Sequence, residues 1–336
     1  MRFALTGEQE ALRDAVRELL EKACPPAVVR AAWTDPAAPA ALAVALARMG
    51  VPGMAAPPEC GGSGVDDVGA VAVLIELGAA AVPLPIAETA AVAVPLLVAA
   101  GDPGGWLPSI VDGATRVAVR TGPGPVHHAG RADRVLDLAG PGALLRPAAG
   151  RSVSTVDGSL LARSLDGLAS GDVVTGDARL VALARDRMCV ATAAQVVGLC
   201  RRMLDLTVGY VRVRRQFGVP VGSFQAVQHR LADALVQVEF AEPAVYAAAW
   251  AVRTDAVERP RDVSAAVVLT VDAARFVARA ALQCHGAIGH TVEYDLHLYA
   301  KRAWALAAAC DLDAHLERLA AALDLPANTV GKGAPA

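Results

Sequence analysis

One cluster of residues, between positions 214 and 225, is suited to binding a phosphate group beside a flat aromatic ring. Arg214 can donate two parallel hydrogen bonds to phosphate oxygens, and its guanidinium stays charged at any working pH. Phe217 offers an apolar face, and Gln225 carries an amide that both donates and accepts hydrogen bonds. Taken singly, Arg214 is better explained as a solvated helix-end residue and Phe217 as a core aromatic, so only the constellation supports the prediction.

A second cluster begins at Gln283, whose amide has the same capacity for hydrogen bonds. It is followed by Gly286 and the small Ala287, which would let backbone N–H groups approach a phosphate closely. The two clusters are far apart in the sequence, so a shared site requires long elements that bring them together.

Long helical segments predicted after residue 180 would have to position both clusters. Residues 181–215 contain no proline, and further helical runs cover 224–257, 261–285 and 295–323. Pro243 is expected to kink or interrupt the second run. Four helices of comparable length with short connections favour a bundle.

The first hundred residues predict shorter helices. Thr6 and Gln9 form the capping-box pattern ahead of a first helix, and Ala40–Met49 predicts another that ends at Gly50. Residues 57–64, rich in Pro and Gly, predict a loop, and Val65–Leu77 predicts an amphipathic helix.

The middle of the chain predicts strands. Short β-branched runs such as 116–119 and 172–175 alternate there with Gly, Pro and Asp. We therefore expect a mostly α fold with a small central β module. The expected parts are an N-terminal helical domain (1–103), a reduced middle β domain (104–180), a C-terminal four-helix bundle (181–325) and a disordered tail (326–336).

Composition excludes several classes of function. Hydrophobic residues make up 54% of the chain, but its longest apolar stretch is broken by prolines and Glu88, so no membrane-spanning helix is predicted. A net charge of -3 gives no reason to expect nucleic acid as a partner. No signal peptide is visible, and the six cysteines form no C-x-x-C pair, which indicates free thiols in a cytoplasmic protein. The histidine spacing predicts no metal site.

Three motifs, taken in order, resemble those of a known family. The run Pro-Glu-Cys-Gly-Gly-Ser-Gly at 58–64 precedes Glu-Leu-Gly at 76–78. Arg-Arg-Gln-Phe-Gly at 214–218 precedes Phe-Gln at 224–225, and Gln-Cys-His-Gly-Ala-Ile-Gly follows at 283–289. In this order and spacing the chain resembles the acyl-CoA dehydrogenase family, closely at both ends and poorly in the middle.

The resemblance implies an FAD site that two subunits share. In that family, the equivalent residues hold the adenosine diphosphate half of an FAD whose flavin ring lies in the neighbouring subunit. In this chain the residues are Arg214, Gln216, Phe217, Phe224, Gln225, Gln283, Gly286 and Ala287. Ala287 stands where the family commonly has a second glycine, which would weaken the diphosphate contact slightly.

The catalytic base of the family is missing from both places where the resemblance would put it. Removing the α-proton of an acyl-CoA thioester needs a positioned carboxylate. Most members carry this glutamate after a Leu-Tyr pair, where this chain has Ala309, and others carry it on the first bundle helix, where Met188 stands. General-base catalysis contributes roughly 10²–10⁴-fold in rate, so we predict no catalytic residue on this chain.

The loop that lines the flavin in the family also differs. A Thr-Glu-Pro-x-x-Gly-Ser pattern is usual there, whereas residues 121–128 of this chain lack both the acidic residue and the serine. Together with the short middle module, this makes a flavin-ring pocket on this chain doubtful.

These features resemble the base-less subunits of heteromeric α2β2 acyl-CoA dehydrogenases, known chiefly from bacterial breakdown of steroid side chains. On this hypothesis the chain contributes the adenosine diphosphate half of the FAD site. The partner subunit supplies the catalytic glutamate and most of the acyl-CoA pocket, and an electron-transfer flavoprotein accepts the electrons.

Two alternatives remain open. One is a self-sufficient homodimeric acyl-CoA dehydrogenase with an unrecognised base, for which Glu293, Asp295 and Asp311 are the candidates. The other is a non-redox scaffold or binding protein that keeps only the fold. Lys301 and Arg302 are interpreted as solvated side chains rather than as contacts of the CoA phosphates.

Overall fold

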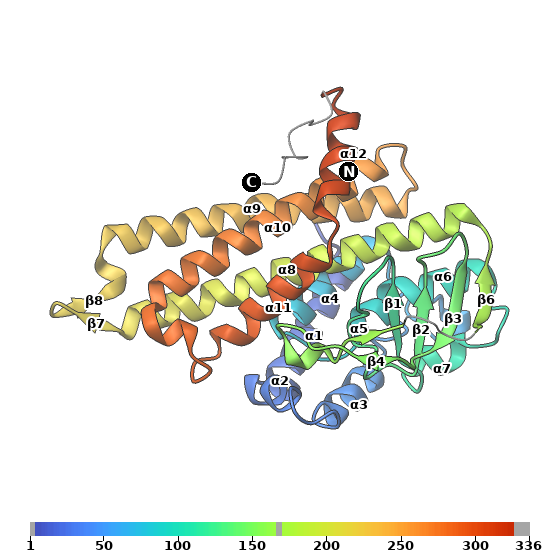
Figure 1. The fold of residues 1–336 in the computed structure, drawn as a ribbon, viewed down its shortest axis with the longest axis horizontal. Helices are drawn as coiled ribbons and strands as arrows, with labels where there is room; N and C mark the ends of the chain where they lie inside the picture. Colours follow the sequence, from blue (N-terminus) through green and yellow to red (C-terminus); the bar gives the residue numbers. More distant parts are fainter. Residues whose placement is uncertain (1–3, 166–169, 326–336) are drawn as a thin grey trace, which may run out of the picture.

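One helix, α8 (Ala178–Val213), runs from a small β module at one end of the molecule to a β-hairpin at the other (Figure 1). The computed structural model describes residues 4–165 and 170–325. The helix begins where the Asp177 carboxylate accepts hydrogen bonds from the N–H groups of Arg179 and Leu180. The predicted disordered tail, 326–336, lies outside the described residues.

The long helices α9 (Gln225–Arg253) and α10 (Arg259–His285) pack on each other and on α8 to form the C-terminal bundle. Two shorter helices complete it, α11 (Leu296–Ala309) against α8 and α12 (Leu312–Ala322) against α10. Of the two outcomes predicted for Pro243, a kink or a break, the break is wrong, because α9 continues through that residue.

The predicted single helix over 295–323 is divided in two. Cys310 has an extended backbone, and the Asp311 carboxylate then accepts a hydrogen bond from the N–H of Ala314. An aspartate at this position starts a new helix by satisfying one of its free N–H groups, and the chain turns at the junction.

The N-terminal part is helical, as expected. The capping box of Thr6 and Gln9 is present at the start of α1. Short helices follow up to the β module: α1 (Gly7–Ala23), α2 (Pro26–Ala31), α3 (Ala40–Arg48), α4 (Asp67–Ala79), α5 (Ile86–Glu88), a π-helical turn (Thr89–Ala93), α6 (Val94–Ala100) and α7 (Leu107–Val111). The α4 helix is not amphipathic as predicted: all residues from Gly69 to Gly78 are buried, because other helices cover it on every side.

The middle module contains a four-stranded sheet in the order β1-β2-β3-β6. Its strands are β1 (Val117–Arg120), β2 (Arg134–Asp137), β3 (Ala143–Pro147) and β6 (Asp172–Thr175). The β1 and β2 strands are parallel, and the other two pairings are antiparallel. A separate two-stranded pair joins β4 (Arg151–Ser152) to β5 (Arg163–Ser164).

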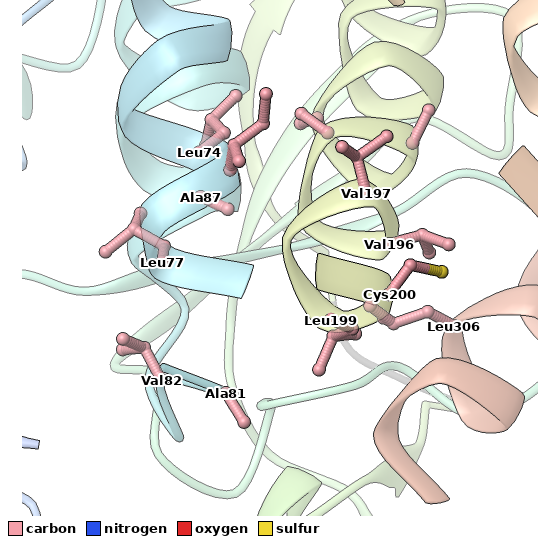
Figure 2. Packing of buried hydrophobic residues seen from close by; sticks show 14 of the residues in the cluster. Leu74, Leu77, Ala81, Val82, Ala87, Val196, Val197, Leu199, Cys200 and Leu306 are labelled. Carbon is pink, nitrogen blue, oxygen red and sulfur yellow. The ribbon is translucent and has the colours of Figure 1, made fainter. Parts of the chain in front are cut away.

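The N-terminal part and the bundle are joined where α4 crosses α8 at two glycines. A Cβ atom on Gly78 would lie 2.1 Å from the carbonyl oxygen of Gln195, and one on Gly198 would lie 1.9 Å from that of Ile75. The backbones can meet this closely only without side chains. Around the crossing, Leu74 and Leu77 of α4 belong to the same buried cluster as several residues of α8 (Figure 2).

The motif at 58–64 is explained by a tight turn. A Cβ atom on Gly62 would lie 2.1 Å from the carbonyl oxygen of Ala56, and Gly61 and Gly64 have left-handed backbones with φ of 82° and 65°. This motif therefore shapes the loop ahead of α4. Among the described residues, no helix is long and apolar enough to cross a membrane.

Candidate functional site

The first predicted cluster lies on a hairpin between α8 and α9. Its two short strands are β7 (Arg215–Gln216) and β8 (Val219–Pro220), which pair antiparallel. The two residues at its tip, Phe217 and Gly218, both have positive φ, 53° and 83°. This is the signature of a type I′ turn, whose twist matches that of the flanking strands.

Phe217 is held at this tip in an unfavourable conformation and in contact with water. A bulky residue with a left-handed backbone is an outlier, at a cost of order 1–3 kcal/mol. The side chain is 94% exposed, and its one ring contact is an edge-on contact with Phe224 at 6.2 Å between centroids. The apolar face predicted for a flat ring is therefore accessible.

Arg214 and the start of α9 lie beside the base of this hairpin. The carbonyl of Arg214 accepts a hydrogen bond from the N–H of Val221 at 2.8 Å, while its exposed side chain has no ion pair with any described residue. The α9 helix starts at Gln225 with Phe224 as its N-cap, and no side chain caps it. The N-terminus of a long helix combines free N–H groups with a positive dipole end, which favours a bound anion.

Tyr210 links this hairpin to the second cluster. It lies in the last turn of α8, where its carbonyl accepts a hydrogen bond from the N–H of Arg214. Its ring stacks on that of His285 at 4.4 Å between centroids, and its hydroxyl donates to the His285 carbonyl at 3.4 Å. The C-terminal end of α10 therefore lies at the same end of the bundle as the hairpin (Figure 1).

Gly286 ends α10 in a conformation that requires glycine. Its φ of 65° and ψ of -140° lie in a region that residues with a side chain avoid. No atom lies within 4 Å of the position where its Cβ would be, so the backbone is open to a close approach. Gln283 and Ala287 beside it are also exposed.

The eight predicted cofactor residues are thus all exposed and lie on two segments at one end of the bundle. One ring contact joins two of them, Phe217 and Phe224. Their part in binding a cofactor stays a prediction.

Sequence reasoning missed a pocket that opens beside Gln283. This pocket, of about 380 Å³, lies between α10 and α11 and the turn that joins them. Its lining is formed by Arg275, Arg279, Leu282, Gln283, His290 and Trp304. The spacing of the two arginines and Gln283, four residues apart each time, was a signal in the sequence that could have pointed to it.

The two positions at which the resemblance would place a catalytic base, Met188 and Ala309, are followed directly by Cys189 and Cys310. Cys189 Sγ lies 3.9 Å from His315 Nε2, and the other ring nitrogen of His315 lies 3.0 Å from the Ser264 hydroxyl. Burial raises the pKa of the Cys189 thiol to about 12 and lowers the pKa of His315 to about 4. Both groups are therefore neutral near pH 7, so Cys189 is not a nucleophilic thiolate at that pH.

Carboxylates near Met188 are engaged in ion pairs. Asp67 bonds Arg187 at 2.8 Å, and Asp186 bonds Arg259 at 2.7 Å. Burial raises the pKa of Asp186, although the charge of Arg259 opposes this rise.

Two of the three alternative base candidates also have partners. Asp295 forms an ion pair with Arg30 at 2.5 Å, and Asp311 caps α12. Glu293 is exposed in the segment between α10 and α11.

A buried polar network fills the junction between α11 and the middle module, and it corrects the interpretation of Arg302 as solvated. Arg302 is 2% exposed and forms an ion pair with Asp157, donates to the Ser159 hydroxyl at 2.7 Å and donates to the Val82 carbonyl at 3.0 Å. Burial raises the pKa of Asp157, but Arg302 and the hydrogen bonds of Ser159 outweigh it and hold that pKa below its usual value. Lys301, in contrast, stays partly exposed over the Trp33 ring.

The loop that would line a flavin ends in the same junction. His128 is 2% exposed with a left-handed backbone, and its Nδ1 has no hydrogen-bond partner among the described residues. Burial lowers the pKa of neighbouring His127 to about 4. A second concave site, of about 420 Å³, lies elsewhere, between α1, α4, α8 and α11. Neither this site nor the pocket beside Gln283 includes a residue of the middle module. The described residues contain no cluster of potential metal ligands.

Sequence comparison places both ends of the chain in one family. A family model described as the N-terminal domain of acyl-CoA dehydrogenases matches residues 6–114, and the model of their C-terminal domain matches residues 178–309. The chain is 34% identical over 308 residues to acyl-CoA dehydrogenase IpdE2 of Mycolicibacterium smegmatis, a match that covers 89% of this chain and 93% of that protein.

Structural comparison gives the same result and confirms the expected fold class. The ChsE4–ChsE5 complex from Mycobacterium tuberculosis contains a chain with a TM-score of 0.81 and 25% identity, with 100% of both chains covered. A variant of the Tcur3481–Tcur3483 steroid ACAD contains a chain with a TM-score of 0.84 and 24% identity, covering 94% of this chain and 98% of that one.

Proposed function

The chain belongs to the acyl-CoA dehydrogenase family, an oxidoreductase family that typically depends on FAD, and we propose that it is the base-less subunit of a heteromeric α2β2 enzyme. In this assembly it holds the adenosine diphosphate half of an FAD whose flavin ring lies in a partner subunit. The partner supplies the catalytic glutamate and most of the acyl-CoA pocket.

The observation that carries the proposal is the exposed hairpin tip. Phe217 holds an apolar ring in water on a strained backbone, beside an arginine and an uncapped helix N-terminus. Such an arrangement is unfavourable for an isolated surface, but it suits a ligand that combines an aromatic base with phosphates. Arg214 and the α9 N–H groups would hold the phosphates, and Phe217 would pack against the base.

A second observation concerns the flavin side of the site. In the family the flavin, when bound, accepts the hydride that leaves the substrate. On this chain the junction where the middle module meets α11 is filled by Arg302, Asp157 and Ser159, with His128 buried nearby. Because side chains occupy this junction, the flavin ring is better accommodated by another subunit.

A third observation concerns proton abstraction. Around Met188, the nearest carboxylates described above are paired with arginines, and Asp311 caps a helix. A carboxylate that already bonds an arginine or a backbone N–H group of its own chain is held in that position, and a catalytic base must instead lie within hydrogen-bond reach of the substrate proton. These pairings support a partner as the source of the base.

The surface of the bundle supports a protein partner. Every phenylalanine in the described part of the chain is at least 37% exposed, and Phe240 on α9 reaches 70%. Aromatic side chains are enriched at protein interfaces.

The solved relatives are named as a complex of ChsE4 with ChsE5 and as a steroid ACAD of Tcur3481 with Tcur3483. We extend to this chain both the assembly with a second subunit and the action on steroids, and we propose a steroid side-chain CoA thioester as the substrate.

The cell compartment and electron acceptor are part of the same proposal. The six cysteines are free, which fits a cytoplasmic enzyme. An electron-transfer flavoprotein is the acceptor that we propose, by analogy with the family alone.

The test is the ratio of flavin to polypeptide in two preparations, the chain alone and the chain co-expressed with an acyl-CoA dehydrogenase encoded beside it. We expect the chain alone to be colourless and the co-expressed pair to form a yellow α2β2 complex with one flavin per heterodimer. Arg214→Gln should lower the flavin content of the complex, whereas Arg212→Gln, an exposed arginine in the last turn of α8, should leave it unchanged.

Two results would replace the proposal. One flavin per chain in the isolated protein, with turnover that Glu293→Gln abolishes, would establish the self-sufficient enzyme. Absence of flavin from every complex that contains the chain would favour the non-redox scaffold.

A further inference from the structure

We propose that Tyr210, His285 and Tyr294 form a stack of rings that positions the two halves of the cofactor site and so determines how tightly the site holds its ligand. The three rings act through the backbone that carries them and do not touch the ligand, so they are positioning residues. This inference deepens the proposed function and rests on it, because it concerns the half-site formed by the hairpin and the end of α10.

Each ring of the stack comes from a different segment of the chain. Tyr210 lies in the last turn of α8, His285 is the last residue of α10, and Tyr294 lies between α10 and α11. The rings of Tyr210 and His285 are 4.4 Å apart between centroids and 21° from parallel, and Tyr294 packs on His285 at 4.8 Å. The two tyrosines meet edge-on at 5.7 Å. Because every pair is in contact, displacing one ring disturbs the other two.

Hydrogen bonds join the two tyrosines to the backbone of neighbouring segments. The Tyr210 hydroxyl donates to the carbonyl of His285 at 3.4 Å, which links the end of α8 to the end of α10. The Tyr294 hydroxyl donates to the carbonyl of Leu206 at 3.3 Å, one turn before Tyr210 on α8. The segment after α10 is therefore linked to the same turn of α8 as the segment before it.

The stack lies between the two segments of the predicted half-site. The N–H of Arg214 donates to the carbonyl of Tyr210 at 2.9 Å, and Gly286, with its open backbone, follows His285 directly. Two groups that hold one ligand must keep a fixed separation, because a displacement on the order of 1 Å is enough to weaken a binding site. The stack supplies this fixed separation.

The hydrogen bonds of His285 indicate that its flat ring matters more than its nitrogen atoms. Its Nδ1 lies 2.8 Å from the Ala281 carbonyl, which can only accept, so we assign the proton to Nδ1. Its Nε2 is buried and has no hydrogen-bond partner within residues 4–165 and 170–325. Burial also lowers the pKa of His285, so the ring is neutral near pH 7. A phenylalanine should therefore replace it in the stack.

The test compares variants that keep a ring with variants that lose it, in the complex with the partner subunit. Tyr210→Phe and His285→Phe keep the stack, whereas Tyr210→Leu and His285→Leu each remove one ring. Tyr246→Leu is the matched control, because Tyr246 is also a half-buried tyrosine of the bundle but lies on α9, outside the stack. Should His285→Leu fail to fold, Tyr294→Leu removes a ring from the half-buried side of the stack.

The measurements are the dissociation constant of FAD from the flavin-stripped complex, the melting temperature without FAD, and the KM of the acyl-CoA at saturating FAD. We expect the leucine variants within the stack to raise the dissociation constant of FAD by about ten- to a hundred-fold, and the phenylalanine variants by less than about threefold. The KM should not change, because the acyl-CoA pocket lies mostly in the partner. Rings that only stabilised the fold would lower the melting temperature without this selective loss of FAD.

Two results would overturn the inference. In the first, Tyr210→Leu holds FAD as tightly as the Tyr246→Leu control. In the second, Tyr210→Phe and His285→Phe lose as much affinity as the leucine variants, which would assign the effect to the hydroxyl and the ring nitrogens instead of the stack.

Failure of the proposed function would give a different result, because no wild-type complex would then retain flavin. In that case hydrogen exchange in the free chain tests the stack. Peptides that cover 214–225 and 286–290 should exchange faster in Tyr210→Leu than in Tyr246→Leu, because the two segments are no longer held together. Equal exchange in the two variants would overturn the inference whether or not flavin binds.

Discussion

At the scale of single residues, two side chains are held in states that an isolated protein would avoid. Phe217 combines a left-handed backbone with 94% exposure. Glu88 is 4% exposed, and its Oε2 has no hydrogen-bond partner among the described residues. The effect of each residue on the free energy of unfolding can be measured with a single substitution.

Replacing Phe217 with asparagine should stabilise the isolated chain and weaken flavin retention. Asn-Gly is the favoured pair in a type I′ turn, so relief of strain should raise the free energy of unfolding by about 1 kcal/mol. Urea denaturation of the chain and flavin content of the complex are the two measurements. A loss of stability would show instead that the ring packs against the protein.

The charge of Glu88 should make stability fall as pH rises. Burial raises the pKa of Glu88 from 4.5 to about 7, although the charge of Arg302 opposes the rise. The folded state therefore holds a proton that the unfolded chain has lost between these pH values. Its stabilising effect is complete below pH 4.5 and is lost as pH rises through 7.

Glu88→Gln isolates this effect from other titrating groups. At pH 8 the variant should be more stable than the wild type by about 3 kcal/mol, and near pH 4 the two should be alike. Denaturant unfolding of both proteins across this range is the measurement. A stability difference that does not change with pH would show that Glu88 titrates normally.

At the scale of elements, the crossing of α4 and α8 decides how the N-terminal part meets the bundle. Gly198→Ala should lower the free energy of unfolding by about 1–3 kcal/mol, because its methyl group would push against the Ile75 carbonyl. Gly209→Ala on the same helix has open space around it and should raise stability by about 0.5–1 kcal/mol. Equal effects in a denaturation experiment would mean that the crossing tolerates a side chain.

The parts of the fold that could be predicted were the helices and strands whose own residues carry a recognisable pattern. The capping box at Thr6, the long proline-free run of α8 and the β-branched segment of β6 all formed where expected. Two features depended on contacts that sequence spacing does not show. The α4 helix is buried on every side by distant elements, and Asp311 starts a new helix where the apolar pattern continues unbroken.

The candidate site was predictable to a similar degree. Residue types identified the Arg214 and Gln283 clusters, and the structure places both at one end of the bundle through Tyr210. The pocket that includes Arg279 and Trp304 depends on the packing of α11 against α10, which no local pattern encodes. Arg302 shows the same limit, because its burial follows from meeting Asp157 across the molecule.

At the scale of the whole molecule, the exposed end of the bundle should become protected when the partner and FAD are present. Hydrogen exchange is expected to slow in the β7–β8 hairpin and in the first turns of α9, whereas α1 to α3 should exchange as in the free chain. Mass spectrometry of peptides from the chain alone and from the complex is the measurement. Unchanged exchange in the hairpin would place the partner elsewhere.

The position of the hairpin also has a consequence for the fate of newly made chains. Exposed loop tips are preferred sites of proteolytic cleavage, and this hairpin extends from the end of the bundle (Figure 1). A chain that has not met its partner would display this segment, and one that has assembled would cover it. The abundance of the chain in the cell would then follow the supply of the partner and of flavin, so surplus copies would be degraded rather than accumulate.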